Sequence, residues 1–167
     1  MRTREKIEQL IDGLGYDFSR FMIPNFIAHL SQSIGRKIFL IPCAMPEGTF
    51  GAWLTDNELP LEYLIIDQGI SGQHAIHVQL HELGHMMMRH QTGRITSHLL
   101  QALIAGKDDT VLQQALHRRP SRQDDEQEAE LFAVIIQERL MQVARIHYLE
   151  TSSSSDTLQQ YFSDLGM

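Results

Sequence analysis

The residues with the clearest chemical potential form the run His81-Glu82-Leu83-Gly84-His85, which follows the pattern H-E-x-x-H. On an α-helix, side chains four positions apart lie about 40° and 6 Å from each other, so His81 and His85 can reach a single metal ion. Glu82 is turned about 100° from His81, which places its carboxylate beside an open coordination position. There it can take a proton from water. The motif predicts a metal site with His81 and His85 as ligands and Glu82 as general base.

The helix that carries this motif has two distinct faces. Apolar residues with helical spacing would suit any amphipathic core helix, and they are Ile76, Leu80, Leu83 and Met87. Histidines gather within about 80° on a different side, and they are His74, His77, His81 and His85. A core helix has no need of the second face, whereas a helix along a polar cleft does. We therefore interpret His74 and His77 as cleft lining.

A zinc site of this kind needs a third protein ligand and an open fourth position. The only cysteine is Cys43, so no disulfide or thiolate cluster can form, and the ligand must be a histidine or a carboxylate. A histidine six residues after His85 would complete one known pattern, but Gln91 stands there. His90 lies about 140° around a continuous helix from His85. The third ligand is therefore expected further along the chain.

Residues 124–133, with the sequence DDEQEAELFA, offer several carboxylates. The apolar residues of the helix they begin define its buried face, and they are Ala129, Phe132, Ala133, Ile136, Leu140 and Val143. Glu126 and Glu130 lie at the edge of that face, whereas Glu128 points to the far side. We predict Glu126 as the third ligand and Glu130 as an acceptor that orients a ligand histidine. Glu128 and Glu130 are the alternative ligands.

The composition is that of an ordinary globular protein, with 43% hydrophobic and 21% charged residues, and 167 residues fit one domain over 1–167. A formal net charge of −7 disfavours direct binding of nucleic acid through its phosphates. There is neither an apolar targeting segment nor a stretch of membrane-spanning length. We expect a cytoplasmic protein with no membrane contact and of unassigned oligomeric state.

The elements that must position the motifs predict an α+β fold. Two N-terminal helices are expected, at 4–12 and 19–34. A small, mostly antiparallel three-stranded sheet follows, with strands at 37–41, 49–54 and 63–67. The metal-binding helix spans about 72–91, two short helices cover 97–105 and 109–117, and the ligand-bearing helix runs from 121 to about 148. A flexible Ser-rich break at 151–156 precedes a last short helical segment.

Both motifs resemble those of the ImmA/IrrE family of metallopeptidases. The resemblance lies in the apolar run entering the motif at 81–85, the preceding strand 63–67, and residues 126–133. The last segment is similar to the family's E-x-E-A-N/D-x-F-A, with Glu130 in place of Asn or Asp, and the family's following Leu-Leu-Met-Pro is replaced by residues 135–138. The order of elements matches over about residues 20–148.

This resemblance implies a zincin-like, gluzincin-like fold, bound Zn²⁺, and cleavage of a specific intracellular protein, often a helix-turn-helix repressor. Peptide hydrolysis would use Glu82 to take a proton from water and return it to the leaving amine. Candidate donors to the oxyanion are His117, His147 and Tyr148. Residues 48–53 form either the cleft rim that pairs with an extended substrate or an ordinary sheet strand.

Two other classes of function stay open. The first is a metal hydrolase that acts on a bond other than a peptide bond, since the geometry predicts an activated water and not its target. The second is a binding module that holds a structural metal and sequesters a regulatory partner. Its metal would be closed by a fourth protein ligand, for which His90 and His117 are the candidates.

Overall fold

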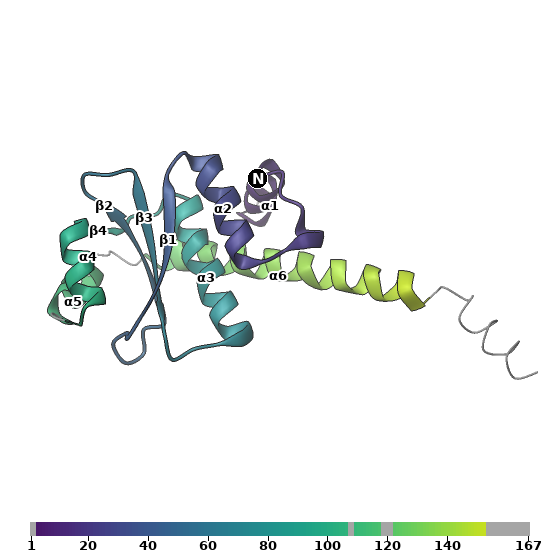
Figure 1. Cartoon of the computed structure of the whole chain (residues 1–167). Helices are drawn as coiled ribbons and strands as arrows, with labels where there is room; N and C mark the ends of the chain where they lie inside the picture. Colours follow the sequence, from purple (N-terminus) through teal and green to yellow (C-terminus); the bar gives the residue numbers. More distant parts are fainter. Residues whose placement is uncertain (1–2, 107–108, 118–121, 153–167) are drawn as a thin grey trace, which may run out of the picture.

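The computed structural model describes residues 3–106, 109–117 and 122–152 (Figure 1). In these ranges the chain is α+β, as the sequence predicts. The elements before the sheet are α1 (Thr3–Gly13), the 3-10 helix η1 (Phe18–Arg20) and α2 (Ile23–Ile34). The strands are β1 (Lys37–Cys43), β2 (Gly51–Asp56), β3 (Leu61–Asp67) and β4 (Gly93–Ile95). The remaining helices are α3 (Gly72–Met87), α4 (Ser97–Ile104), α5 (Asp109–His117) and α6 (Gln123–Ser152).

The sheet differs from the expected one in strand number and in direction. It has four strands in the order β1-β3-β2-β4, and β4 is the additional strand. Only the β2–β3 pair is antiparallel, while β1 is parallel to β3 and β4 is parallel to β2. The prediction of a three-stranded, mostly antiparallel sheet was therefore wrong. β2 and β3 do form an antiparallel hairpin. β1, however, pairs with the edge of β3 opposite β2, and it runs in the same direction as β3.

Apolar residues lie on both faces of β3, because helices pack against each face of the sheet. Leu64 belongs to a core formed with α1, α2, α3 and α6, in which Phe26, Leu80 and Phe132 are fully buried. Ile65 belongs to a second core on the opposite face, where α4 and α5 pack. Figure 1 shows these two short helices on the other side of the sheet from α2 and α3.

The helix boundaries follow local signals. Pro24 lies in the first turn of α2, and Gly35 ends that helix with a φ of 67°, in the left-handed region that favours glycine. α3 begins after Ser71 but ends at Met87, four residues before the predicted end at 91. α6 reaches Ser152 and therefore includes the first two residues of the predicted break at 151–156. The rest of that break and the last predicted helix lie outside the described residues.

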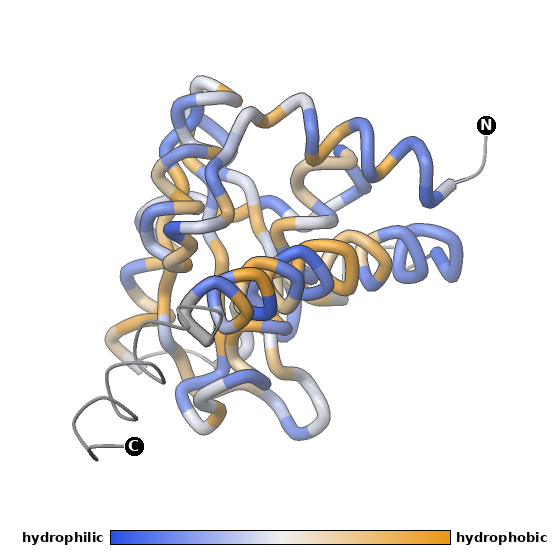
Figure 2. Tube along the Cα trace, turned by 90° about the vertical axis from the view of Figure 1, so that its right-hand side faces the viewer, coloured by the Kyte–Doolittle hydropathy of each residue, from blue (hydrophilic) through white to orange (hydrophobic). Residues whose placement is uncertain are grey.

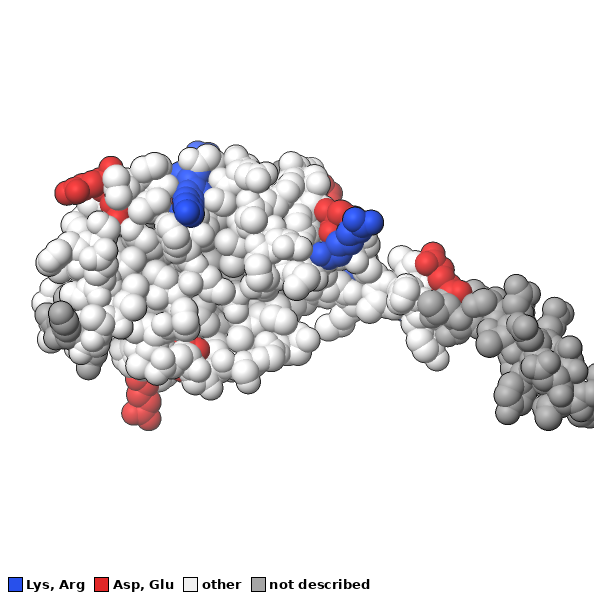
Figure 3. All heavy atoms as spheres, in the orientation of Figure 1, with Lys and Arg blue, Asp and Glu red and all other residues white. Residues whose placement is uncertain are grey.

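Hydropathy and charge can be followed along the helices and over the surface of the described residues. Hydrophilic and hydrophobic residues alternate along the tube of α6 (Figure 2), as in a helix with one buried side. No helix in the described ranges combines the length and the apolarity that crossing a membrane would require. On the face drawn in Figure 3, the charged atoms of the described residues are scattered instead of gathered into a basic patch.

Candidate metal centre

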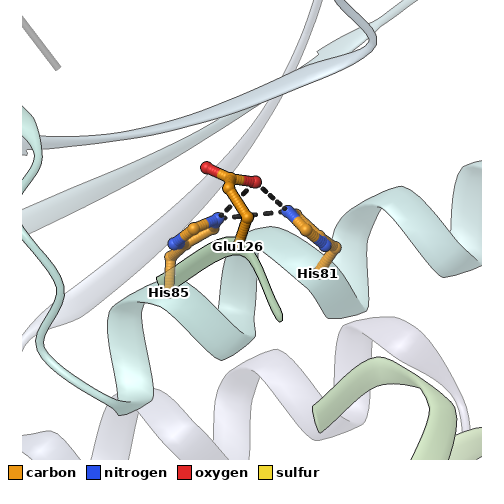
Figure 4. Close-up of side chains that lie close together, drawn as sticks. All are labelled: His81, His85 and Glu126. Atoms are coloured by element: carbon orange, nitrogen blue, oxygen red, sulfur yellow. Dashed lines mark hydrogen bonds and ion pairs between the residues drawn. The ribbon is translucent and has the colours of Figure 1, made fainter. Parts of the chain in front are cut away.

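Three side chains from two helices converge on one point (Figure 4). The Nε2 atoms of His81 and His85 on α3 lie 3.1 Å apart. Oε2 of Glu126, in the first turn of α6, lies 3.2 Å from the His81 nitrogen and 3.5 Å from the His85 nitrogen. In tetrahedral zinc sites, ligand bonds of about 2.0–2.2 Å place the ligand atoms about 3.3–3.6 Å from each other. The three atoms therefore have the spacing and the chemistry of a metal-binding group, as predicted.

The group lies at the edge of a cleft. His85 is buried, with an exposed fraction of 2%, whereas His81 and Glu126 are half-buried. The cleft measures about 360 Å³, and its walls come from the loop before β2, from β2 and from α3. They are formed by Gly48, Thr49, Phe50, Gly51, His74, His77, Val78, His81, Glu82 and Glu126. His74 and His77 line the cleft, as the histidine face of α3 predicts.

Glu82 lines the same cleft and is itself 4% exposed. The backbone of β2 passes directly over it at Gly51. A Cβ atom at Gly51 would lie 2.6 Å from Cγ1 of Val78 and 3.1 Å from Cγ of Glu82. A side chain at this position would therefore displace β2, Val78 or the side chain of Glu82, and the glycine lets the strand and the candidate base lie in contact.

A second glycine brings the two ligand-bearing helices together. Gly84 stands between His81 and His85 on α3 and faces α6. A Cβ atom there would lie 3.0 Å from the carbonyl oxygen of Ala129 and 3.1 Å from Cβ of Phe132. Because Gly84 has no side chain at this crossing, the helices approach closely and Glu126 comes within reach of both histidines.

The outer nitrogens of the ligand histidines also have partners. Nδ1 of His81 lies 3.4 Å from Oε2 of Glu130, which was predicted to orient a ligand histidine. The hydrogen bond of this oxygen is to Nε2 of His77, at 3.0 Å. On the other side, Nδ1 of His85 lies 2.9 Å from Nδ1 of His90. The candidate ligand His85 therefore has a hydrogen-bonding partner at its outer nitrogen, and the candidate ligand His81 has a carboxylate close to its own.

The structure separates the remaining candidates. Glu128 contacts Nε2 of His90 at 3.1 Å instead of joining the three ligand atoms. His90 faces the outer nitrogen of His85 and is not a fourth ligand in this geometry. His147 lines a separate apolar groove beside Phe18, and Tyr148 is 68% exposed, so neither lines the cleft. The side chain of His117 lies outside the described residues.

The position of His90 was missed because the prediction treated the helix as continuous. α3 ends at Met87, and Arg89 then adopts a φ of 57°. The backbone N–H of His90 donates to the carbonyl of His85 over 3.0 Å. This turn carries the His90 ring back toward His85 instead of about 140° away from it. The contacts of Gly51 and the His90–Glu128 pair had no recognisable signal in the sequence.

Comparison with models of protein families and with curated proteins finds no match for this chain.

Proposed function

We propose that the protein is a zinc-dependent endopeptidase with a zincin-like fold, similar to the ImmA/IrrE metallopeptidases. His81, His85 and Glu126 hold Zn²⁺, and Glu82 is the general base. The observation that carries this proposal is the placement of three ligand atoms at tetrahedral spacing beside a cleft that Glu82 also lines. The donor set of two imidazoles and one carboxylate is one that catalytic zinc sites use, with a position left open.

The chemistry follows from the positions of the side chains. Zn²⁺ bound at such a site supplies Lewis acidity, which acidifies water and polarises a carbonyl group. Glu82 accepts the proton of the attacking water and then gives it to the leaving amine, so one carboxylate acts first as base and then as acid. Its burial beside Gly51 keeps the carboxylate on the cleft side of α3. The contacts at their outer nitrogens help to keep the Nε2 atoms of His81 and His85 toward Glu126.

The free edge of β2 favours a peptide as the substrate over other molecules. The N–H of Asp67 donates to the carbonyl of Phe50, so the backbone groups of Gly51 point away from β3. β4 pairs with β2 only from Leu54 onward, and no other strand of the described ranges covers the edge before it. Since Gly51 also lines the cleft, an extended peptide can add to this edge with its backbone beside Glu82.

The substrate is proposed to be a specific cytoplasmic protein, of which a helix-turn-helix repressor is the candidate that the family resemblance supplies. A sequestering module with a structural metal is the alternative. It would need a closed coordination shell, and His90 is turned to the outer nitrogen of His85 instead of filling the fourth position. The open position and the placement of Glu82 support hydrolysis.

The test compares wild type with Glu82→Gln and with Glu58→Gln, which makes the same change in an exposed loop. Each protein is loaded with zinc, its metal content is measured, and it is incubated with a denatured protein mixture and with candidate repressors. New peptide termini are identified by mass spectrometry. We expect about one zinc per chain in all three, and cleavage by wild type and Glu58→Gln only, because an amide cannot accept the proton of water at neutral pH.

Other outcomes decide against the proposal. Equal cleavage by wild type and Glu82→Gln would remove Glu82 from its role. Capture of an intact partner by both proteins, with no cleavage, would favour the binding module. His81→Ala, His85→Ala and Glu126→Ala should each lower zinc affinity, and full metal content in all three would refute the site.

A further inference from the structure

A buried chain of hydrogen bonds leads from the candidate metal centre to the surface of α6. Nδ1 of His85 lies 2.9 Å from Nδ1 of His90, and Nε2 of His90 lies 3.1 Å from Oε2 of Glu128. The side chains of His85 and His90 are 3% and 7% exposed, and that of Glu128 is 39% exposed. Nothing in the proposed reaction uses His90 or Glu128, so their arrangement needs another explanation.

The positions of the protons in this chain follow from the ligand role of His85. A neutral imidazole that binds a metal through Nε2 carries its proton on Nδ1. The Nδ1–H of His85 must then donate to Nδ1 of His90, which leaves the proton of His90 on Nε2. That N–H donates to the carboxylate of Glu128. Each nitrogen therefore has a single role, and the direction of the chain runs from the ligand to the carboxylate.

The backbone that places His90 adopts a rare conformation. Arg89 is the one non-glycine residue with positive φ among the described residues, and a non-glycine residue rarely adopts the left-handed region. This conformation turns the chain at the end of α3 and puts the His90 ring against that of His85, with ring centroids 5.1 Å apart. Unusual backbone geometry beside a candidate site is a reason to look for a role of the residue that it positions.

The two ligand histidines are supported in different ways. His81 has Glu130, a carboxylate whose side chain is 51% exposed and which His77 shares. His85 has a buried imidazole between itself and its carboxylate. The three alternate glutamates of α6 therefore each meet a different part of the histidine cluster, with Glu126 at the metal-binding group, Glu128 at His90 and Glu130 at His81.

We propose that His90 and Glu128 are positioning residues that hold the ring of His85 in the orientation and tautomer required for metal binding. The inference rests on the metal site of the proposed function and extends it to two residues outside the ligand set. Partners of this kind orient ligand histidines in other metal sites, and their loss costs about 10- to 100-fold in metal affinity.

Three variants test the pair. His90→Phe keeps an aromatic ring and removes both hydrogen bonds, whereas His90→Gln retains an acceptor and a donor in one amide. Glu128→Ala removes the last acceptor from a half-buried position and does not disturb the packing of α3. Asp124→Ala is the control, since it removes an exposed carboxylate one turn before Glu128 on the same helix.

Zinc affinity is measured by competition with a chromophoric chelator, and folding is checked by circular dichroism. We expect a 10- to 100-fold loss for His90→Phe, a smaller loss for Glu128→Ala, and nearly wild-type affinity for His90→Gln and Asp124→Ala. Nitrogen NMR of the histidine rings in the zinc-loaded protein gives a readout independent of activity. It should show protons on Nδ1 of His85 and on Nε2 of His90.

Wild-type affinity in folded Glu128→Ala together with wild-type affinity in His90→Phe would overturn the inference, and so would a proton on Nδ1 of His90. If His90→Phe does not fold, Glu128→Ala and the NMR tautomers decide. His81→Ala separates this failure from that of the proposed function. If His81→Ala loses zinc but the His90 and Glu128 variants do not, the metal site stands and only the positioning role of His90 and Glu128 is refuted. If the wild-type protein binds no zinc, both proposals are refuted.

Discussion

The glycine at the crossing of α3 and α6 offers a way to perturb the metal centre without changing a ligand. In Gly84→Ala, the new methyl group would lie 3.0 Å from the carbonyl oxygen of Ala129 and 3.1 Å from both its Cα and Cβ of Phe132. Carbon atoms in ordinary contact lie about 3.5–4.0 Å apart, so the helices must separate by about 0.4 Å or more. Two of these atoms belong to the backbone of α6 and cannot rotate away.

The expected effect on stability is the difference of two terms. Alanine is about 1 kcal/mol more favourable than glycine in the middle of a helix. Overpacking at a closely packed site costs about 1–3 kcal/mol. We therefore expect Gly84→Ala to be neutral or to destabilise the protein by up to about 2 kcal/mol in urea unfolding, with the metal removed by a chelator.

The effect on metal binding should be larger than this small net change suggests. Zinc–ligand distances in proteins vary by only about 0.2 Å, so a shift of the helix that carries Glu126 is not absorbed without strain. We expect about tenfold weaker zinc binding. Gly13→Ala is the control, because a Cβ atom at Gly13 would have no neighbour within 4 Å. If Gly84→Ala raises the free energy of unfolding by about 1 kcal/mol and binds zinc as tightly as wild type, the close helix crossing does not matter to the site.

Two further predictions concern β2 and the opposite face of the sheet. Gly51→Ala should keep its zinc but lose most of the proposed peptidase activity. The added methyl group would lie 2.6 Å from Val78 and 3.1 Å from Cγ of Glu82, and it would displace the candidate base. Cleavage assays and metal analysis check this, and unchanged turnover would contradict it. Burial and the hydrogen bond to Asp56 raise the pKa of the Tyr63 hydroxyl from 10.0 to about 12. Its stabilising contribution is thus complete below pH 10 and is lost as the pH rises toward 12. Tyr63→Phe should flatten the alkaline fall in unfolding free energy, and an unchanged fall would exclude Tyr63 as its source.

Features that depend on one helix at a time could be predicted from the sequence. The histidine spacing in α3 and the position of Glu126 beside the apolar face of α6 both follow from helical geometry, and the structure brings these residues together. Glu130 could be placed in the same way, because it lies one turn from Glu126 on the same face.

Features that depend on where a helix ends or on which strands meet could not be predicted in this way. The turn at Arg89 places His90 against the candidate ligand His85. On a continuous helix the two rings would point in different directions. β4 has only three residues, Gly93–Ile95, too few for a hydrophobic pattern to appear. The place of β1 on the outer side of β3 depends on packing between distant segments, so the parallel pairing carried no local signal.

The distance along the chain between the ligands has a consequence for folding. His85 and Glu126 belong to segments about 40 residues apart, so an ion held by both would link these segments in the folded chain and stabilise it by about 2.7 kcal/mol at a free metal concentration about 100 times the dissociation constant. A protein with a single cysteine has no internal disulfide to do this. Metal supply would then also govern how fast the chain is degraded, because proteases cut the transiently unfolded form and bound metal lowers the population of that form. Metal starvation would then lower the amount of the folded protein as well as the occupancy of its candidate metal centre.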